Sequence, residues 1–263
     1  MPLPSTSYFL RDCTITFHNL LNVNEFTRKN ELWKGLMKYK WLSKMLFVFA
    51  IFASVLLIMS VVDWWSQTPD QVNSLTELGS VASSLFKGGY DLFVIGGLKY
   101  VVLILAEVVI FHFARRSLEI VTNEEVDNSF EAFWIAQKRM VKVAIFSFIM
   151  ESIYSLVFKL GTSIIGLGWI NPAGIFLIQC FFLGYAIIDN YNEIFHLTLK
   201  QSFKVAQRYA GVALVIGIPV YLIMLMPLLG TILGPILGAI AATITMNKLV
   251  RIDGGLDWAY QIE

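Results

Sequence analysis

The sequence predicts an all-α integral membrane protein with two long transmembrane helices, two broken helical hairpins that can be re-entrant, and amphipathic interfacial helices. Two observations carry this prediction. Hydrophobic residues make up 57% of the 263 residues and charged residues only 15%, against about a quarter in a soluble domain. Long uncharged stretches also alternate with groups of lysine and arginine, as they do where helices enter and leave a bilayer. We expect a single membrane domain over residues 1–263.

The first span is predicted over residues 45–62, an uncharged stretch of 18 residues. At about 1.5 Å per residue, a helix of that length just crosses about 30 Å of hydrocarbon. Residues 28–44, which precede it, carry six basic residues against one acid. Because positive charge is retained on the cytoplasmic side, we expect residues 1–44 to be a cytoplasmic or interfacial segment with a cytoplasmic N-terminus.

The second span is predicted over residues 92–114, and it ends at Arg115 and Arg116, which again mark the cytoplasmic side. The intervening residues 63–91 carry four acids and one lysine, a composition that fits a segment on the outer side. Lysine and arginine recur after each later apolar stretch. If all these basic groups are cytoplasmic, each apolar stretch between them leaves and returns on the same side.

This alternation predicts two helical hairpins, over residues 143–188 and 209–247. The first is interrupted by GLGWINPAG at 166–174, and the second has Pro227 near its midpoint. Proline cannot continue a helical hydrogen-bond ladder, and glycine tolerates a reversed backbone. The second hairpin has 39 uncharged residues, whereas two full crossings need about 40, so a re-entrant hairpin and two short, tilted spans both stay open.

Broken helices in a bilayer serve a particular purpose. Unpaired backbone groups at membrane depth cost several kcal/mol each, so they persist only where protein or water satisfies them. Such breaks aim helix amino termini at a cavity, where free N–H groups suit an anion. We therefore predict pore or hinge residues at Pro227, Gly230, Gly234 and Pro235. In the alternative interpretation, the prolines only kink helices and the glycines only let helices pack closely.

Ionisable residues within the apolar stretches are rare and often functional. Glu107 lies near the middle of the second predicted span. We hypothesise that Glu107 faces the interior of an oligomer, where it either binds a proton coupled to anion movement or pairs with a basic residue of a neighbouring helix. In the alternative interpretation, Glu107 only makes a polar contact between helices. His112, nearer the cytoplasmic edge, could relay protons. Glu151 and Lys159 are expected to mark a shallow, partly wet helix rather than a site.

Two further segments are predicted to be helical and outside the hydrocarbon. Residues 114–134 alternate basic and acidic blocks, as a solvated connecting helix does. Residues 197–211 place three basic residues four apart on one face, which fits an amphipathic helix lying on anionic headgroups. Arg208 in this helix is also a candidate for guiding anions toward a pore.

Three stretches follow one another in a characteristic order: GYAIIDNYNE at 184–193, KQSFKVAQRYAG at 200–211 and MPLLGTILGPILGAIAAT at 226–243. Together they resemble the CysZ-type sulfate permease family, whose domain is shared with the etoposide-induced membrane proteins of eukaryotes. The resemblance implies two long transmembrane helices plus two hairpins that penetrate only part of the bilayer. It also implies a homo-oligomer that sits among the lipids of the bacterial inner membrane and takes up sulfate or a similar inorganic anion.

The chain departs from this family pattern near the entrance to the first long helix. The family tends to show glycine-leucine-arginine there, which the resemblance associates with sulfate binding. Here Gly35 and Leu36 are followed by Met37, and Lys38 comes one place later. A lysine supplies charge without the bidentate geometry of arginine, so anion binding at this point would depend on backbone N–H groups and on Lys34 and Lys38. The departure bears on the substrate more than on the fold.

Enzyme motifs are not found in the sequence. It contains no GxSxG, HExxH or phosphate-loop pattern, and its three histidines are scattered, so we predict neither an enzyme nor a metal or other cofactor. A net charge of +1 gives no reason to expect a nucleic-acid partner. The expected function is an inner-membrane anion permease or channel. The alternative is a non-transporting membrane scaffold or a subunit of a larger membrane complex.

Overall fold

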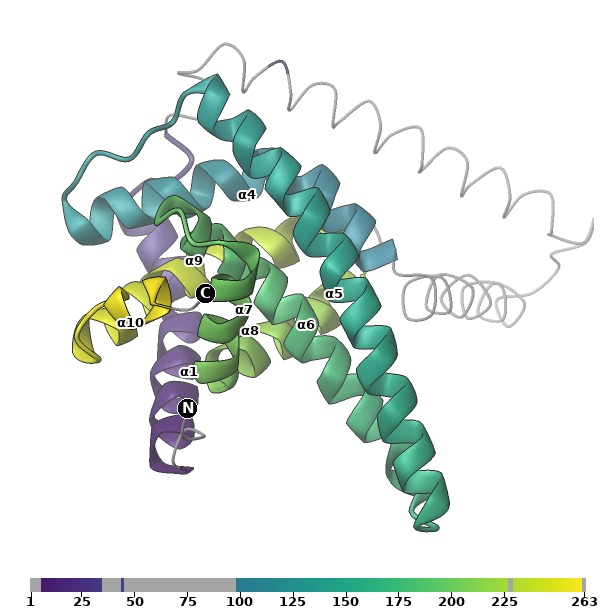
Figure 1. Ribbon diagram of the computed structural model, residues 1–263. Helices are drawn as coiled ribbons and strands as arrows, with labels where there is room; N and C mark the ends of the chain where they lie inside the picture. The colour runs from purple at the N-terminus through teal and green to yellow at the C-terminus, as the bar shows by residue number, and fades with distance from the viewer. Residues whose placement is uncertain (1–5, 35–43, 45–97, 227–228, 262–263) are drawn as a thin grey trace, which may run out of the picture.

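The computed structural model describes residues 6–34, 44, 98–226 and 229–261, and within these ranges all regular secondary structure is helical. The predicted first span therefore lies outside the described residues. The helices are α1 (Thr6–Lys29), α4 (Leu98–Thr122), α5 (Phe130–Ile164), the 3₁₀ helix η1 (Gly168–Ile170), α6 (Asn171–Ile194), α7 (Leu199–Arg208), α8 (Ala210–Met224), α9 (Leu229–Ile252) and α10 (Asp257–Tyr260) (Figure 1).

Three stretches of the described chain are long and apolar enough to cross a membrane. They are Phe130–Ile164, Gly168–Ile194 and Gly230–Ile252, which correspond to α5, α6 with η1, and α9. The bent pair α7 and α8 would count as a fourth. The prediction of an all-α protein with helices of membrane length is confirmed at this level. The helix α4, which coincides with most of the second predicted span, is not one of the three.

The first predicted hairpin is formed by α5 and α6, which meet at the tip that projects from the other described helices in Figure 1. Its turn lies at the predicted GLGWINPAG stretch. Gly166 has a positive φ of 78°, which suits a residue without Cβ, and Pro172 sits in the first turn of α6, where its missing N–H costs nothing. The sequence therefore located this turn correctly from local chemistry.

The start of α5 differs from the prediction. A continuous connecting helix over residues 114–134 is wrong, because α4 ends at Thr122 and Asn123 follows with a φ of 58° in the left-handed region. Residues 123–129 are not helical, and Ser129 then caps α5 by accepting a hydrogen bond from the Ala132 N–H. The apolar helix thus begins 13 residues before the predicted hairpin boundary at residue 143.

The second predicted hairpin is formed by α8 and α9, with the turn between Met224 and Leu229. Pro227, predicted at this turn, lies outside the described residues. The 15 residues of α8 span about 22 Å, which is less than the hydrocarbon thickness. At Tyr209 the chain bends by 91° between α7 and α8, so the amphipathic α7 runs across the direction of α8.

The core is built around α6 and α9, and the most extensive contact between described helices is the crossing of α6 with α8. A Cβ added at Gly184 of α6 would lie 1.9 Å from the carbonyl oxygen of Ala213, and one at Gly217 of α8 would lie 1.8 Å from that of Cys180. Small residues four apart on both helices therefore let the two backbones touch, as in small-xxx-small packing. Two of the buried polar residues described below, Asp189 and Glu193, lie on α6 beyond this crossing.

The N-terminal helix α1 packs against α8 and α9 instead of forming a separate arm. Arg11 donates to both carboxylate oxygens of Asp253, at 2.8 and 3.0 Å, and the Tyr209 hydroxyl donates to the same carboxylate at 3.0 Å. About two helical turns further along α1, Asn19 donates to Thr245 at 3.0 Å. These bonds join α1 to the C-terminal end of α9.

Replacing Asp253 with asparagine is expected to weaken this joint at neutral pH. Burial raises the pKa of Asp253, but the hydrogen bonds from Arg11 and Tyr209 outweigh it, so the pKa is lower than usual. A lowered pKa stabilises the fold above about pH 4, and that contribution is lost as the pH falls through the folded-state value. We expect Asp253→Asn to lower the free energy of unfolding by about 1–3 kcal/mol at pH 7 and by less at acid pH.

Unfolding of the wild type and of Asp253→Asn in detergent, at pH 7 and at acid pH, measures this effect. The exposed neighbour Asp257 provides the matched control, since Asp257→Asn should change stability by less than about 0.5 kcal/mol. Equal, small losses for both variants would show that the bidentate pair does not hold α1 in place.

Candidate functional site

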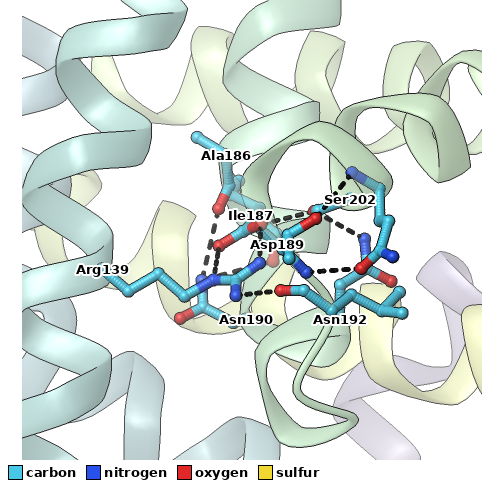
Figure 2. Close-up of polar contacts among 10 residues, drawn as sticks. Arg139, Ala186, Ile187, Asp189, Asn190, Asn192 and Ser202 are labelled. Atoms are coloured by element: carbon cyan, nitrogen blue, oxygen red, sulfur yellow. Dashed lines mark hydrogen bonds and ion pairs between the residues drawn. The ribbon is translucent and has the colours of Figure 1, made fainter. Parts of the chain in front are cut away.

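A buried polar cluster lies where α5, α6 and α7 meet, and Figure 2 shows its centre. Asp189 of α6 accepts two hydrogen bonds from Arg139 of α5, each at 2.7 Å, and a third from the Ser202 hydroxyl of α7. Arg139 also donates to the Leu197 carbonyl oxygen. The capping box of Thr198 begins α7 and places Ser202 one turn further, facing α6. We call this group, together with Arg115 and Glu193, the α6 cluster.

Arg115 extends the α6 cluster to α4. Its guanidinium donates to Glu193 at 2.8 Å and to the Asp127 carbonyl oxygen at 2.8 Å. The two side chains are only 6% and 10% exposed. Arg115 is therefore a buried, paired residue, and the acid that neutralises it comes from a different helix. Its assignment to the cytoplasmic side stays a prediction.

Glu107 lies beside the α6 cluster, inside its own protomer. Glu107 is only 1% exposed, and its Oε2 atom has no hydrogen-bond partner among the described residues. Glu193, Asp189 and Arg115 act on it electrostatically. The hypothesis that Glu107 binds a proton stays a prediction. His112, the predicted relay, is also buried and lies 3.3 Å from the Leu32 carbonyl oxygen through its Nε2 atom.

A cavity of about 830 Å³ adjoins the α6 cluster at Arg115 and Glu193. Of the described residues that line it, six are acidic and two are arginines. Its charge therefore opposes the accumulation of a free dianion at this end of the protein.

A second buried polar group joins α4 to the middle of α5, and we call it the Lys99 site. The Lys99 ammonium donates to Oε1 of Glu151 at 2.7 Å, and the Tyr100 hydroxyl donates to Oε2 of the same carboxylate at 2.6 Å. Lys99 is 0% exposed and Glu151 is 5% exposed. Adjacent residues of one helix thus hold both oxygens of a carboxylate that belongs to another helix.

The walls of the Lys99 site are aromatic and thiol groups. The Tyr221 ring of α8 lies 5.5 Å from the Lys99 ammonium, and the Tyr221 hydroxyl donates to Gln179 of α6 at 3.0 Å. The thiol of Cys180 is close enough to Lys99 and Glu151 to interact with both electrostatically. Four helices therefore enclose the site among the described residues.

The Lys99 site lies halfway along the apolar part of α5. Lys142 and Lys159 are exposed on α5, 17 residues and so about 25 Å apart, and Glu151 is the only charged residue between them. The expectation that Glu151 and Lys159 mark a partly wet helix is wrong for Glu151. Its side chain points into the protein because Lys99 of α4 neutralises it.

Other predicted binding residues lie apart from both groups. The Lys34 side chain is 67% exposed and pairs with Glu31. Gly35, Leu36 and Lys38 lie outside the described residues, so anion binding there stays a prediction. Arg208 ends α7, with its guanidinium 4.4 Å above the ring of Trp258.

The predicted pore or hinge residues that the structure describes lie in α9. A Cβ at Gly230 would lie 1.8 Å from the Ile223 carbonyl oxygen, and one at Gly234 would lie 3.0 Å from Met224. Both glycines therefore let α8 pack closely against α9, and Pro235 lies within the helix. A hinge role for them stays a prediction.

Comparison of the chain with protein-family models, with curated proteins and with solved structures finds no match. In the part of the chain that the structure describes, no group of three or more histidine, cysteine, aspartate or glutamate residues could hold a metal ion. Function must therefore be inferred from the two buried polar groups.

Proposed function

We propose that the protein is a homo-oligomeric permease or channel of the bacterial inner membrane that moves an inorganic oxyanion, sulfate or a similar ion. The observation that carries the proposal is the Lys99 site, an ammonium group completely buried at the level of the middle of an apolar helix. Ionisable residues at membrane depth are costly, and they commonly line the path of an ion or substrate. A lysine beside a hydroxyl donor is suited to an oxyanion.

In this proposal α5 and α6 cross the whole bilayer. The 25 Å or so between Lys142 and Lys159 matches about 30 Å of hydrocarbon once both lysines extend toward the headgroups. Trp134 and Trp169 are exposed beyond the two lysines, where tryptophans anchor helices at opposite interfaces. This arrangement differs from the partial penetration that the family resemblance implies for the first hairpin.

Uptake of labelled sulfate into vesicles that contain only the purified protein tests the proposal. We expect the uptake to be saturable. Selenate and sulfite should inhibit it more strongly than chloride does, because the Lys99 and Tyr100 donors match two oxygens of one oxyanion. Uptake no greater than in protein-free vesicles would contradict the proposal. A partner that copurifies in fixed ratio would then favour the scaffold alternative.

Glu107 is proposed to carry the proton that is coupled to anion movement. Its carboxyl group is buried, and its Oε2 atom has no hydrogen-bond partner among the described residues, which leaves that oxygen available to a proton. We expect an inward proton gradient to accelerate uptake by the wild type, and we expect Glu107→Gln to abolish that acceleration. Glu124→Gln, a change at an exposed acid, is the control and should respond like the wild type. A Glu107→Gln variant with unaltered pH dependence would remove the coupling hypothesis.

A further inference from the structure

The Lys99 site has the donor arrangement of an oxyanion receptor that is already filled. Its two donors come from consecutive residues of α4, and each holds one oxygen of the same carboxylate, at 2.7 and 2.6 Å. A sulfate ion presents pairs of oxygens in a similar way. The carboxylate of Glu151 now occupies the two donors. Because Glu151 belongs to α5, its side chain can move away from Lys99 while α4 stays intact.

We propose that Lys99 and Tyr100 form the anion-binding site within the membrane, and that the carboxylate of Glu151 occupies this site at rest as a tethered competitor of the transported oxyanion. The inference rests on the proposed function, whose substrate site it names. An entering anion takes the place of Glu151 on both donors. When the anion leaves, Glu151 returns and closes the path.

Burial explains why such a competitor is needed. An ammonium group left unpaired in hydrocarbon costs several kcal/mol, so an empty Lys99 site would be unstable. Glu151 neutralises Lys99 between transport events. The Tyr100 and Tyr221 rings lie 5.3 and 5.5 Å from the ammonium and keep it dry, which strengthens its attraction for whichever anion is present. Cys180 and Gln179 complete the described surroundings without adding a second fixed charge.

The location also favours this site over the other described basic groups. Arg139 and Arg115 are bound to Asp189 and Glu193 within a network of several further hydrogen bonds. The cavity beside Arg115 is predominantly acidic. Among the described residues, Lys99 has one competing carboxylate, at the middle level of α5.

The test uses thermal unfolding of full-length variants in detergent, with sodium sulfate as the probe and sodium chloride at equal ionic strength as the control. Glu151→Gln removes the competing charge and leaves Lys99 unpaired. We expect sulfate to raise the Tm of this variant by several degrees more than that of the wild type, because a ligand stabilises the state that binds it. In the double variant Lys99→Met with Glu151→Gln, which buries no charge, the sulfate effect should vanish.

Each outcome decides the inference. If sulfate raises the Tm of Glu151→Gln no more than that of the double variant, the inference is overturned. This holds even if the wild type transports sulfate, in which case the proposed function stands without this site. If the selective stabilisation is found in a protein that transports nothing, the site stands and the proposed transport fails. Should Glu151→Gln not fold in either salt, the double variant decides by uptake: loss of sulfate transport by the folded double variant supports the site, and transport like that of the wild type overturns it.

Discussion

Replacing Gly217 with alanine is expected to separate α6 from α8 and to lower the free energy of unfolding by about 3 kcal/mol, at the upper end of the usual cost of overpacking. The added methyl carbon would lie 1.8 Å from the Cys180 carbonyl oxygen, a backbone atom that no rotamer change can move. The helices must therefore shift apart along a crossing where their backbones are in contact. Unfolding in detergent, followed by circular dichroism, measures the loss.

The control is a glycine in an open environment. A Cβ at Gly161 of α5 would meet no heavy atom within 4 Å, so Gly161→Ala should stabilise the helix by up to about 1 kcal/mol through the lower entropy of the unfolded chain. Opposite signs for the two substitutions support the close crossing of α6 and α8. Similar effects for both would mean that the two backbones are further apart.

The second large effect is expected at the α6 cluster. Arg139→Ala leaves the Asp189 carboxylate, which is 3% exposed, without the guanidinium that binds both its oxygens. Loss of one partner of a buried ion pair costs about 3–5 kcal/mol, because the remaining charge stays in a medium that solvates it poorly.

The neighbouring lysine provides the comparison for Arg139. Lys138 is exposed and lies 5.4 Å from the ring of Trp134, so Lys138→Ala should cost less than about 1 kcal/mol. Chemical unfolding of both variants at pH 7 measures the difference. A cost for Arg139→Ala as small as that of Lys138→Ala would show that the α6 cluster contributes little to stability.

Local signals in the sequence located the helix turns. Gly166 adopts a positive φ and Pro172 occupies the first turn of α6, and both effects are local because they do not depend on distant residues. The same holds for the turn between Met224 and Leu229. Hydrophobic runs likewise predicted the apolar helices. The beginning of α5 was missed because its amphipathic first turns were grouped with the connecting segment.

Pairings between distant residues could not be predicted in this way. Lys99 and Glu151 are 52 residues apart, and Arg139 and Asp189 are 50 apart. Each is visible in the sequence as a charge within or beside an apolar run, but helical periodicity assigns a residue to a face and does not say which helix that face meets. For the same reason the pairing of Arg115 with Glu193, 78 residues away, could not be predicted.

The account depends most on the Lys99 site lying in the middle of the bilayer, and the membrane depth of α5 tests this directly. Nitroxide labels at the exposed positions Ile135, Ile149 and Ile164 report depth through their relative collision rates with oxygen and with a polar nickel chelate. We predict that Ile149, near the level of Glu151, is the deepest, with both other labels close to headgroups. Depth that increases steadily from Ile135 through Ile149 to Ile164 would place the hairpin tip at mid-membrane and the Lys99 site nearer the surface, which contradicts the proposed ion path.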